Sequence, residues 1–277
     1  MHNFGQILFV MWRETVEAML VVGILHAWLS HQSEPKRGLL YLWGGVLAGL
    51  VGAFLLGLGI EAVNAVLPEQ GHDYFQAAMM LVAAVLIVQM VFWMRRNGRT
   101  LKNEMEQSLS SSTCQQQGWS VFSLAAIAVA REGSETVVFL SSLAMGKSGF
   151  ASAQFWLALG LGVGLAAVTF YLLQLGSKLG SWRSFFKITE ILLLLLGCAL
   201  FINGIEKLID VQLLPVLKSQ VWDTSGLLDD GSIAGSIVSS FTGYRARPAL
   251  TTFLAFALYW LSIRGLLQMT RQPHRTA

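Results

Sequence analysis

Two short clusters of charged residues stand inside long apolar stretches, and their spacing is suited to binding a cation. Each cluster has one arginine followed by two glutamates, with the same spacing in both. The clusters are Arg13, Glu14 and Glu17 and, 118 residues further along the chain, Arg131, Glu132 and Glu135. In a helix, residues three and four positions apart share a face. Each cluster therefore presents two carboxylates one turn apart, with a guanidinium that can reach the second of them.

If the two clusters meet, four carboxylates and two guanidiniums occupy one small volume with a formal charge of −2. Carboxylates this close repel one another unless a cation or shared protons compensate. Hard metal cations prefer oxygen ligands. The candidate metal ligands are Glu14, Glu17, Glu132 and Glu135, and the candidate supporting residues are Arg13 and Arg131.

Three other interpretations stay open at this point. Arg–Glu salt bridges could only fix helix register, although this leaves one glutamate of each cluster without a cation. A proton relay without metal is the second. The third is an intramembrane serine protease that uses Ser134 and His26, but Glu135 follows Ser134 where a protease favours glycine, and His26 lies at a different depth.

Sulfur ligands offer no alternative metal site. A Cu(I) carrier needs thiolates or thioethers, but Met79 and Met80 belong to no repeated spacing, and Cys114 and Cys198 match no metal-binding pattern. No permanently bound cofactor is predicted.

The composition predicts a helical integral membrane protein. Hydrophobic residues make up 54% of the 277 residues and charged residues only 13%, about half the charged fraction of a soluble domain. A helix needs about 20 mostly apolar residues to cross the hydrocarbon core. Seven stretches meet this length: 4–29, 39–60, 75–94, 119–145, 150–175, 185–206 and 248–267. Each charged residue at bilayer centre costs about 2.5–3.5 kcal/mol, so the clusters indicate a function.

The basic residues predict the orientation. If successive loops alternate between the two sides, 12 lysines and arginines lie on one side and five on the other. The positive-inside rule then places the N-terminus outside and the C-terminus inside. The outer loops carry acidic residues that could attract cations. They are Glu61, Glu69 and Asp73 beside His72 in the second loop, and Asp210, Asp223, Asp229 and Asp230 in the sixth.

The repeated cluster predicts an internal repeat within a single transmembrane domain, 1–277. Repeat one covers about 4–94, repeat two about 119–206, the outer loop 207–247 and the final helix 248–267. Three crossings per repeat make the second copy inverted, an arrangement that places an ion site where the repeats meet. The helix after each cluster contains a GxxxG spacing suited to close helix packing. The glycines are Gly45 with Gly49, and Gly160 with Gly164.

Several further residues have two interpretations each. Glu190 is either a carboxylate on the exit path or a partner of Lys187 at the inner surface. Glu61 and Glu206 end their helices on the outer side and either line an entrance or are simply solvated. Val211–Trp222 in the outer loop is expected to form an amphipathic interfacial helix. His26 and His31 are expected to be interfacial.

The paired R-E-x-x-E motifs resemble those of the oxidase-dependent high-affinity iron permeases. The motifs are Arg13–Glu17 and Arg131–Glu135, and the second has that family's usual glycine, Gly133, where the first has Thr15. The stretches Val221–Ser225 and Gly243–Pro248 also resemble bacterial members. The resemblance covers essentially the whole chain.

This resemblance implies import of ferric iron across the bacterial inner membrane, with the glutamates of both motifs binding the ion in transit. It implies periplasmic partners: an iron-binding protein, a cupredoxin-like protein or a peroxidase. The chain contains no copper or haem constellation, so it is not expected to be an enzyme. Lead permeases share the motif, so another metal cation is the alternative cargo.

Overall fold

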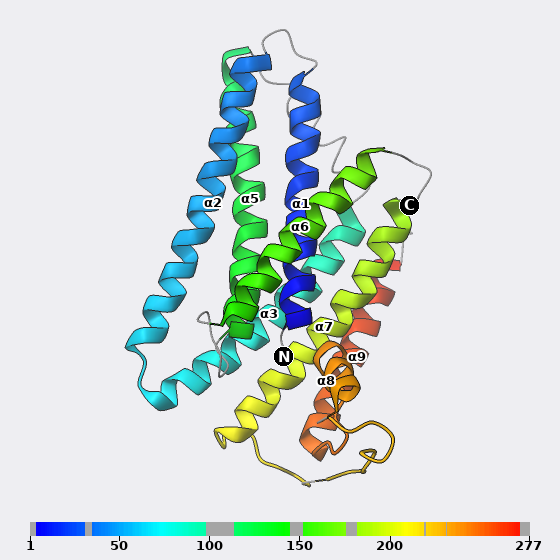
Figure 1. Cartoon of the computed structure of the whole chain (residues 1–277). Coiled ribbons are helices and arrows are strands. Elements are labelled where there is room, and N and C mark those ends of the chain that lie inside the picture. The colour runs from blue at the N-terminus through cyan, green and yellow to red at the C-terminus, as the bar shows by residue number, and fades with distance from the viewer. Residues whose placement is uncertain are drawn as a thin grey trace, which may run out of the picture. The chain divides into compact units, whose positions relative to one another are not determined.

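The computed structural model describes residues 4–30, 35–97, 114–144, 152–175, 182–218, 220–230 and 232–271, and in these ranges it has eight helices and no strands (Figure 1). The helices are α1 (Phe4–Ser30), α2 (Pro35–Val66), α3 (Glu69–Asn97), α5 (Cys114–Ala144), α6 (Ala153–Leu175), α7 (Trp182–Asp210), α8 (Ile233–Thr242) and α9 (Leu250–Arg271). Each predicted span coincides with one of them, and α8 is the helix that the sequence did not predict.

Five of these helices are long and apolar enough to cross a membrane. The segments that qualify are Lys36–Val66, Gln70–Arg95, Ala153–Leu172, Lys187–Asp210 and Leu250–Gln268. The two remaining long helices, α1 and α5, are those that carry the charged clusters. The fold is therefore that of an all-helical, multi-pass membrane protein.

The chain divides into two compact units, and each unit draws helices from both predicted repeats. The first unit, Ile7–Val66 with Asn97–Trp182, holds α1, α2, α5 and α6. The second unit, Met1–Gln6 with Leu67–Arg96 and Arg183–Ala277, holds α3, α7, α8 and α9. The first two helices of each repeat thus belong to one unit, and the third helices belong to the other.

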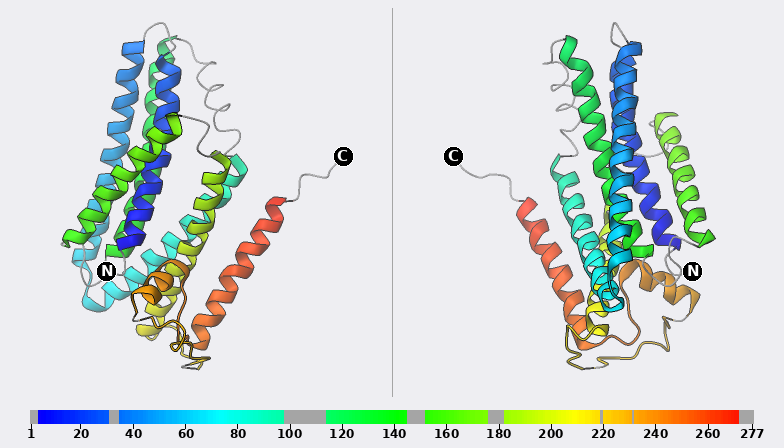
Figure 2. Two further views of the ribbon diagram at one scale, coloured as in Figure 1. Left: turned by 45° about the vertical axis from the view of Figure 1, so that its right-hand side comes forward. Right: turned by 90° about the vertical axis from the view of Figure 1, so that its left-hand side faces the viewer.

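In the first unit, α2 lies along α5, and the two helices run parallel (Figures 1 and 2). Glycines of α2 face the backbone of α5. A Cβ placed on Gly49 would lie 2.8 Å from both the Ala126 carbonyl oxygen and the Val129 Cβ. Further along the pair, Gly57 faces Val137, so residue numbers rise in the same direction along both helices. Since α1 forms an antiparallel hairpin with α2, the cluster-bearing helices α1 and α5 run in opposite directions (Figure 1).

The contact between α6 and α1 repeats the contact between α2 and α5. A Cβ on Gly162 of α6 would lie 3.0 Å from the Leu8 carbonyl oxygen and 2.8 Å from the Met11 Cβ. Leu8 and Met11 precede Arg13 by the same intervals by which Ala126 and Val129 precede Arg131. Glycines at equivalent places therefore bring the backbone of a neighbouring helix up to each cluster-bearing helix.

One of the two predicted GxxxG contacts is wrong. Gly45 and Gly49 of α2 do face α5, but a Cβ on Gly160 or Gly164 of α6 would meet no atom within 4 Å. The glycine of α6 that packs is Gly162, which lies between them on a different face of the helix. Periodicity in a glycine-rich helix does not identify which glycine faces a neighbour.

We expect Gly49→Ala to lower the stability of the protein by about 1–3 kcal/mol, because the added methyl group overpacks against the α5 backbone. Gly164→Ala is the matched control, since its methyl group enters open space. Thermal unfolding of both purified variants in the same detergent measures the difference. Equal melting temperatures would contradict the close α2–α5 approach.

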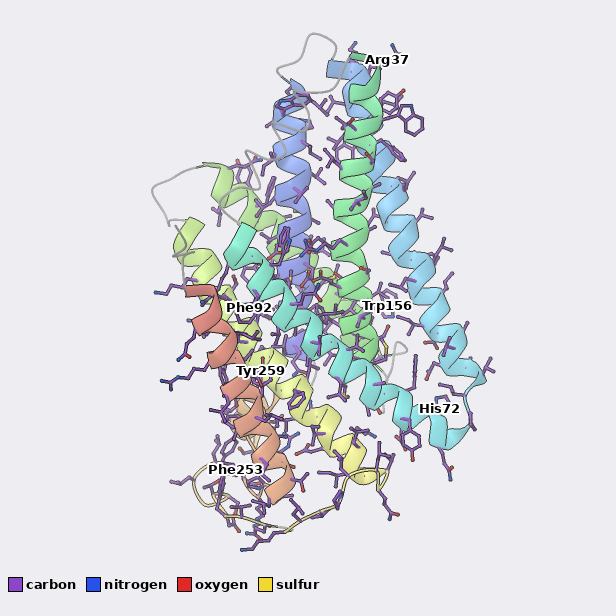
Figure 3. All side chains as sticks on the ribbon, turned by 180° about the vertical axis from the view of Figure 1, so that it is seen from behind. Arg37, His72, Phe92, Trp156, Phe253 and Tyr259 are labelled. Carbon is purple, nitrogen blue, oxygen red and sulfur yellow. The ribbon has the colours of Figure 1, made fainter. Side chains whose placement is uncertain are left out.

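In the second unit, α3 and α7 are packed antiparallel to each other. Gly204 of α7 faces Leu81 of α3, and Gly197 faces Ile87. Residue numbers therefore rise along one helix in the direction in which they fall along the other. Tyr259 of α9 also contacts α7, where its hydroxyl donates a 2.8 Å hydrogen bond to the Leu194 carbonyl (Figure 3).

The segment between α7 and α9 is ordered by polar contacts. Arg245 binds both carboxylate oxygens of Glu206, at 2.7 and 2.6 Å, and donates to Asn203 Oδ1 at 2.7 Å and to Ser239 Oγ. Burial lowers the pKa of Arg245, but the bonds to Glu206 and the charge of Asp230 more than offset this effect, so the pKa lies above its ordinary value. The guanidinium therefore anchors this segment to the end of α7.

The helix predicted at Val211–Trp222 is wrong for the described residues 211–218 and 220–222, which are not helical. Gln212 adopts a left-handed conformation with φ 60°, and the amides of Leu213 and Leu214 return to the Leu208 carbonyl to cap α7. Pro215 then removes an amide that a helix would need. The helix of this segment is α8, which begins at an N-cap, Ser232, and ends at Gly243 with φ 72°.

Candidate metal site

The structure brings the two charged clusters together inside the first unit. Helix α1 carries the first cluster and α5 carries the second, and the glycine contacts described above hold a neighbouring helix close to each. Arg13, Glu14, Glu132 and Glu135 are buried, and Glu17 is partly buried. The predicted convergence of the two clusters is thus present in the structure.

Arg13 is held by both glutamates of its own cluster. Its Nη1 lies 2.7 Å from Glu14 Oε1, and its Nη2 lies 2.5 Å from Glu17 Oε1. The side chain of Arg13 is only 1% exposed. A guanidinium at this depth depends on its carboxylate partners, because water does not replace them.

Arg131 is held less tightly, although its cluster has the same spacing. Its Nε lies 3.2 Å from Glu135 Oε1 and 3.9 Å from Glu132 Oε1, and its side chain is 32% exposed. The two repeats are therefore unequal at the site. The carboxylates of the second cluster lie farther from their arginine than those of the first cluster.

Three carboxylates converge around one point. An oxygen from each of Glu14, Glu132 and Glu135 lies within 4.8 Å of the other two. The Oε2 atoms of these same three residues are buried and have no hydrogen-bond partner among the residues that the structure describes. A buried carboxylate oxygen without a partner is costly, and three converging carboxylates that each have one suit a cation.

Glu17, the fourth predicted ligand, does not belong to this group of three. Its Oε1 accepts the shorter of the two Arg13 contacts, and its side chain is 14% exposed. Sequence spacing could not separate Glu17 from Glu14, because both lie on one helix face beside the same arginine.

The difference between the two motifs at their third position has a steric cause. A Cβ on Gly133 would lie 2.6 Å from the Ala53 Cβ of α2, so the close α2–α5 contact leaves no room for a side chain there. Thr15, at the same place in the first motif, is only partly buried. The motif glycine therefore serves helix packing.

The hydroxyl and imidazole groups near the site do not form a nucleophile and base. Ser134 Oγ donates to the Arg131 carbonyl at 2.8 Å, and Thr136 Oγ1 donates to the Glu132 carbonyl at 2.8 Å. His26 is exposed near the end of α1, and His31 lies outside the described residues. The arrangement gives no support to the protease interpretation.

The other carboxylates have specific positions. Glu190 pairs with Arg95 of α3, not with the predicted partner Lys187, whose side chain is exposed. Glu206 is bound by Arg245, and Glu61 is exposed on α2. Both lie inside helices that extend past their predicted ends, since α2 continues to Val66 and α7 to Asp210.

One polar contact beside the site was not predicted. Trp12 precedes Arg13, and its Nε1 donates a 3.0 Å hydrogen bond to Thr169 Oγ1 of α6. The signal available in the sequence was a threonine inside an apolar span, which is too common to be specific. This bond adds a polar contact where α6 meets α1.

Comparison with known proteins gives a consistent result. The model of the iron permease FTR1 family matches residues 4–270. The "Ferrous iron permease EfeU" of Escherichia coli O6:K15:H31 is 29% identical over 254 residues, which cover 90% of both chains. The protein of the same name from Yersinia pestis is 24% identical over 270 residues, which cover 97% of this chain and 94% of the relative. No solved structure matches the chain.

Proposed function

Because the chain belongs to the iron permease FTR1 family, we propose that it imports iron across the bacterial cytoplasmic membrane through the glutamates of its two R-E-x-x-E motifs. Membership of this family makes the protein a transporter and not an enzyme. The observation that carries the proposed site is the convergence of Glu14, Glu132 and Glu135, which each bring a carboxylate oxygen within 4.8 Å of the others and each keep a buried Oε2 atom without a hydrogen-bond partner among the described residues.

The charge of the site favours a hard cation as cargo. Arg13 and Arg131 contribute two positive charges against four carboxylates, which leaves a formal charge of −2 to attract a cation. We propose that the ion binds Glu14, Glu132 and Glu135, and that Glu17 becomes a ligand only when Arg13 releases it. Ferric iron is the proposed form because its charge is higher than that of ferrous iron, so three carboxylates attract it more strongly.

The competing interpretations account for less of the geometry. Salt bridges that only fix register explain the Oε1 atoms, which Arg13 and Arg131 contact, but they leave the three Oε2 atoms unexplained. A proton relay could use the same carboxylates, and lead could bind the same oxygens. Both therefore become outcomes of the transport experiment.

We also propose that the chain has seven spans arranged as a 3+3 inverted repeat with one additional helix. Two observations support this arrangement: α1 and α5 run in opposite directions, and Gly162 meets α1 as Gly49 meets α5. Helices α1 and α5 then count as spans despite their charges, because the charged groups contact one another and not lipid.

The proposed orientation has the N-terminus outside and the C-terminus inside, with iron handed over by a periplasmic protein. In a variant without Cys114 and Cys198, a cysteine at Gly226 should react with an impermeant thiol reagent added to intact spheroplasts. A cysteine at Lys36 should react only in inside-out vesicles. The reverse pattern would overturn this orientation.

Transport by the purified protein in liposomes tests the proposed function directly. Iron-55 is supplied either as ferric citrate or as ferrous iron kept reduced by ascorbate, with and without excess lead. We expect uptake that lead does not abolish and that Glu14→Gln removes. Relatives are named for ferrous iron, so faster ferrous than ferric uptake would reject the ferric form. Proton movement without iron uptake would reject the permease site altogether.

A further inference from the structure

Two ion pairs join α3 to α7 at opposite ends of these helices. Lys207 Nζ of α7 lies 3.2 Å from Asp73 Oδ1 near the start of α3. At the other end, Arg95 near the end of α3 binds Glu190 Oε1 through Nε and Nη2. All four residues belong to the second unit.

The two pairs have the same polarity at the two ends of α3 and α7. Helices α3 and α7 are the third helices of the proposed repeats, and each has an acidic residue toward its start and a basic residue near its end. The acidic residue of each helix pairs with the basic residue of the other. Exchanging the two helices therefore turns Asp73–Lys207 into a pair of the same kind as Glu190–Arg95, with offsets of 117 residues from Asp73 to Glu190 and 112 from Arg95 to Lys207.

Between the two pairs the helices are held by close packing. A Cβ on Gly204 would lie 3.0 Å from Leu81, and one on Gly197 would lie 3.1 Å from Ile87. These contacts hold the two helices close between the ion pairs, so a tilt about them would act on the two ends in opposite senses. Tilting in one direction separates the helices at one end while the other end stays closed.

The ion pairs themselves can open at low cost. The four side chains are between 13% and 49% exposed, so none of them is sealed inside the protein. Partly exposed pairs contribute about 0–1 kcal/mol, in contrast to the buried Arg13 contacts. Contacts of this strength can be broken and remade within a transport cycle.

We infer that Asp73–Lys207 is an outer latch and Arg95–Glu190 an inner latch, and that the passage of iron opens them in turn. This inference rests on the proposed function and orientation. Both latches are closed in the structure. Lys207 follows Glu206, which Arg245 binds, so the outer latch adjoins the anchored segment before α9.

Thiol accessibility tests the latches separately. Reporter cysteines replace buried residues of α3, Ala77 near the outer latch and Met90 near the inner latch, in a variant without Cys114 and Cys198. Asp73→Asn should raise the reactivity of the Ala77 reporter toward an impermeant reagent added outside by about fivefold, the change expected from about 1 kcal/mol. The Met90 reporter should be unaffected. Glu190→Gln should raise only the reactivity of the Met90 reporter, toward reagent added inside.

Three controls make the result decisive. Exchanging the charges, Asp73→Lys with Lys207→Asp, should restore low reactivity at Ala77, as a latch requires. Arg247→Gln, which breaks the Asp223–Arg247 pair outside this helix pair, should change neither reporter. Iron binding by the detergent-solubilised protein, measured by calorimetry, should persist in Asp73→Asn and Glu190→Gln.

The outcomes separate this inference from the proposed function. Equal changes at both reporters, no change at either, or failure of the charge exchange to restore low reactivity would overturn the latches while leaving iron transport intact. Absence of iron binding and uptake in the unmodified protein would instead overturn the proposed function.

Discussion

Replacing Glu14, Glu132 or Glu135 with glutamine should lower iron uptake by at least about 100-fold while membrane-inserted protein stays near its normal amount. Each substitution keeps the side-chain volume but removes one anionic oxygen from the group of three. Loss of a residue that merely supports a metal ligand costs about 10–100-fold in affinity, so loss of a ligand should cost at least as much. Initial rates of iron-55 uptake, normalised to inserted protein, give the comparison.

Glu17→Gln is the informative contrast within the same motif. Glu17 is held by Arg13 and lies outside the group of three, so its loss should reduce the amount of folded protein more than the uptake per folded molecule. Glu61→Gln, which changes an exposed carboxylate on α2, is the control for a general loss of negative charge. Normal uptake by the Glu14, Glu132 and Glu135 variants would mean that these carboxylates are not ligands.

The two motif arginines should differ strongly when each is replaced with glutamine. Arg13→Gln leaves Glu14 and Glu17 without their cation in a buried site, which costs about 3–5 kcal/mol and should remove most of the inserted protein. Arg131→Gln removes a partly exposed side chain with longer contacts, so a loss of about 1 kcal/mol or less is expected. Melting temperature and yield in detergent measure both effects.

A double substitution separates charge pairing from simple loss of packing. Arg13→Gln combined with Glu17→Gln removes both partners of the shorter contact, and this should restore part of the stability that Arg13→Gln loses. If the double variant is no more stable than Arg13→Gln alone, the unpaired carboxylate is not the cause. If Arg131→Gln lowers the melting temperature and yield as much as Arg13→Gln does, the difference in burial between the two arginines does not determine their contributions to stability.

The two repeats show which features of the site the spacing of charged residues can predict. The shared R-E-x-x-E pattern predicted two helices that present carboxylates to each other, and Glu14, Glu132 and Glu135 do meet. The pattern also predicted Glu17 as an equal fourth ligand, but Glu17 lies outside the group of three, and the buried Arg13 approaches it to 2.5 Å where the more exposed Arg131 lies 3.2 Å from Glu135. Burial of an arginine depends on which helices surround it, and identical motifs carry no information about that.

The amino-acid sequence by itself predicted the positions of seven long helices and placed the charged clusters within two of them, because the length of an apolar stretch is a local property. The tertiary structure decided which surfaces meet. It selected Gly162 instead of Gly160 and Gly164, paired Glu190 with Arg95, and formed α8 where Ser232 and Gly243 cap a short helix. These outcomes depend on contacts between segments far apart in the chain, and one sequence read along its length contains no measure of those contacts.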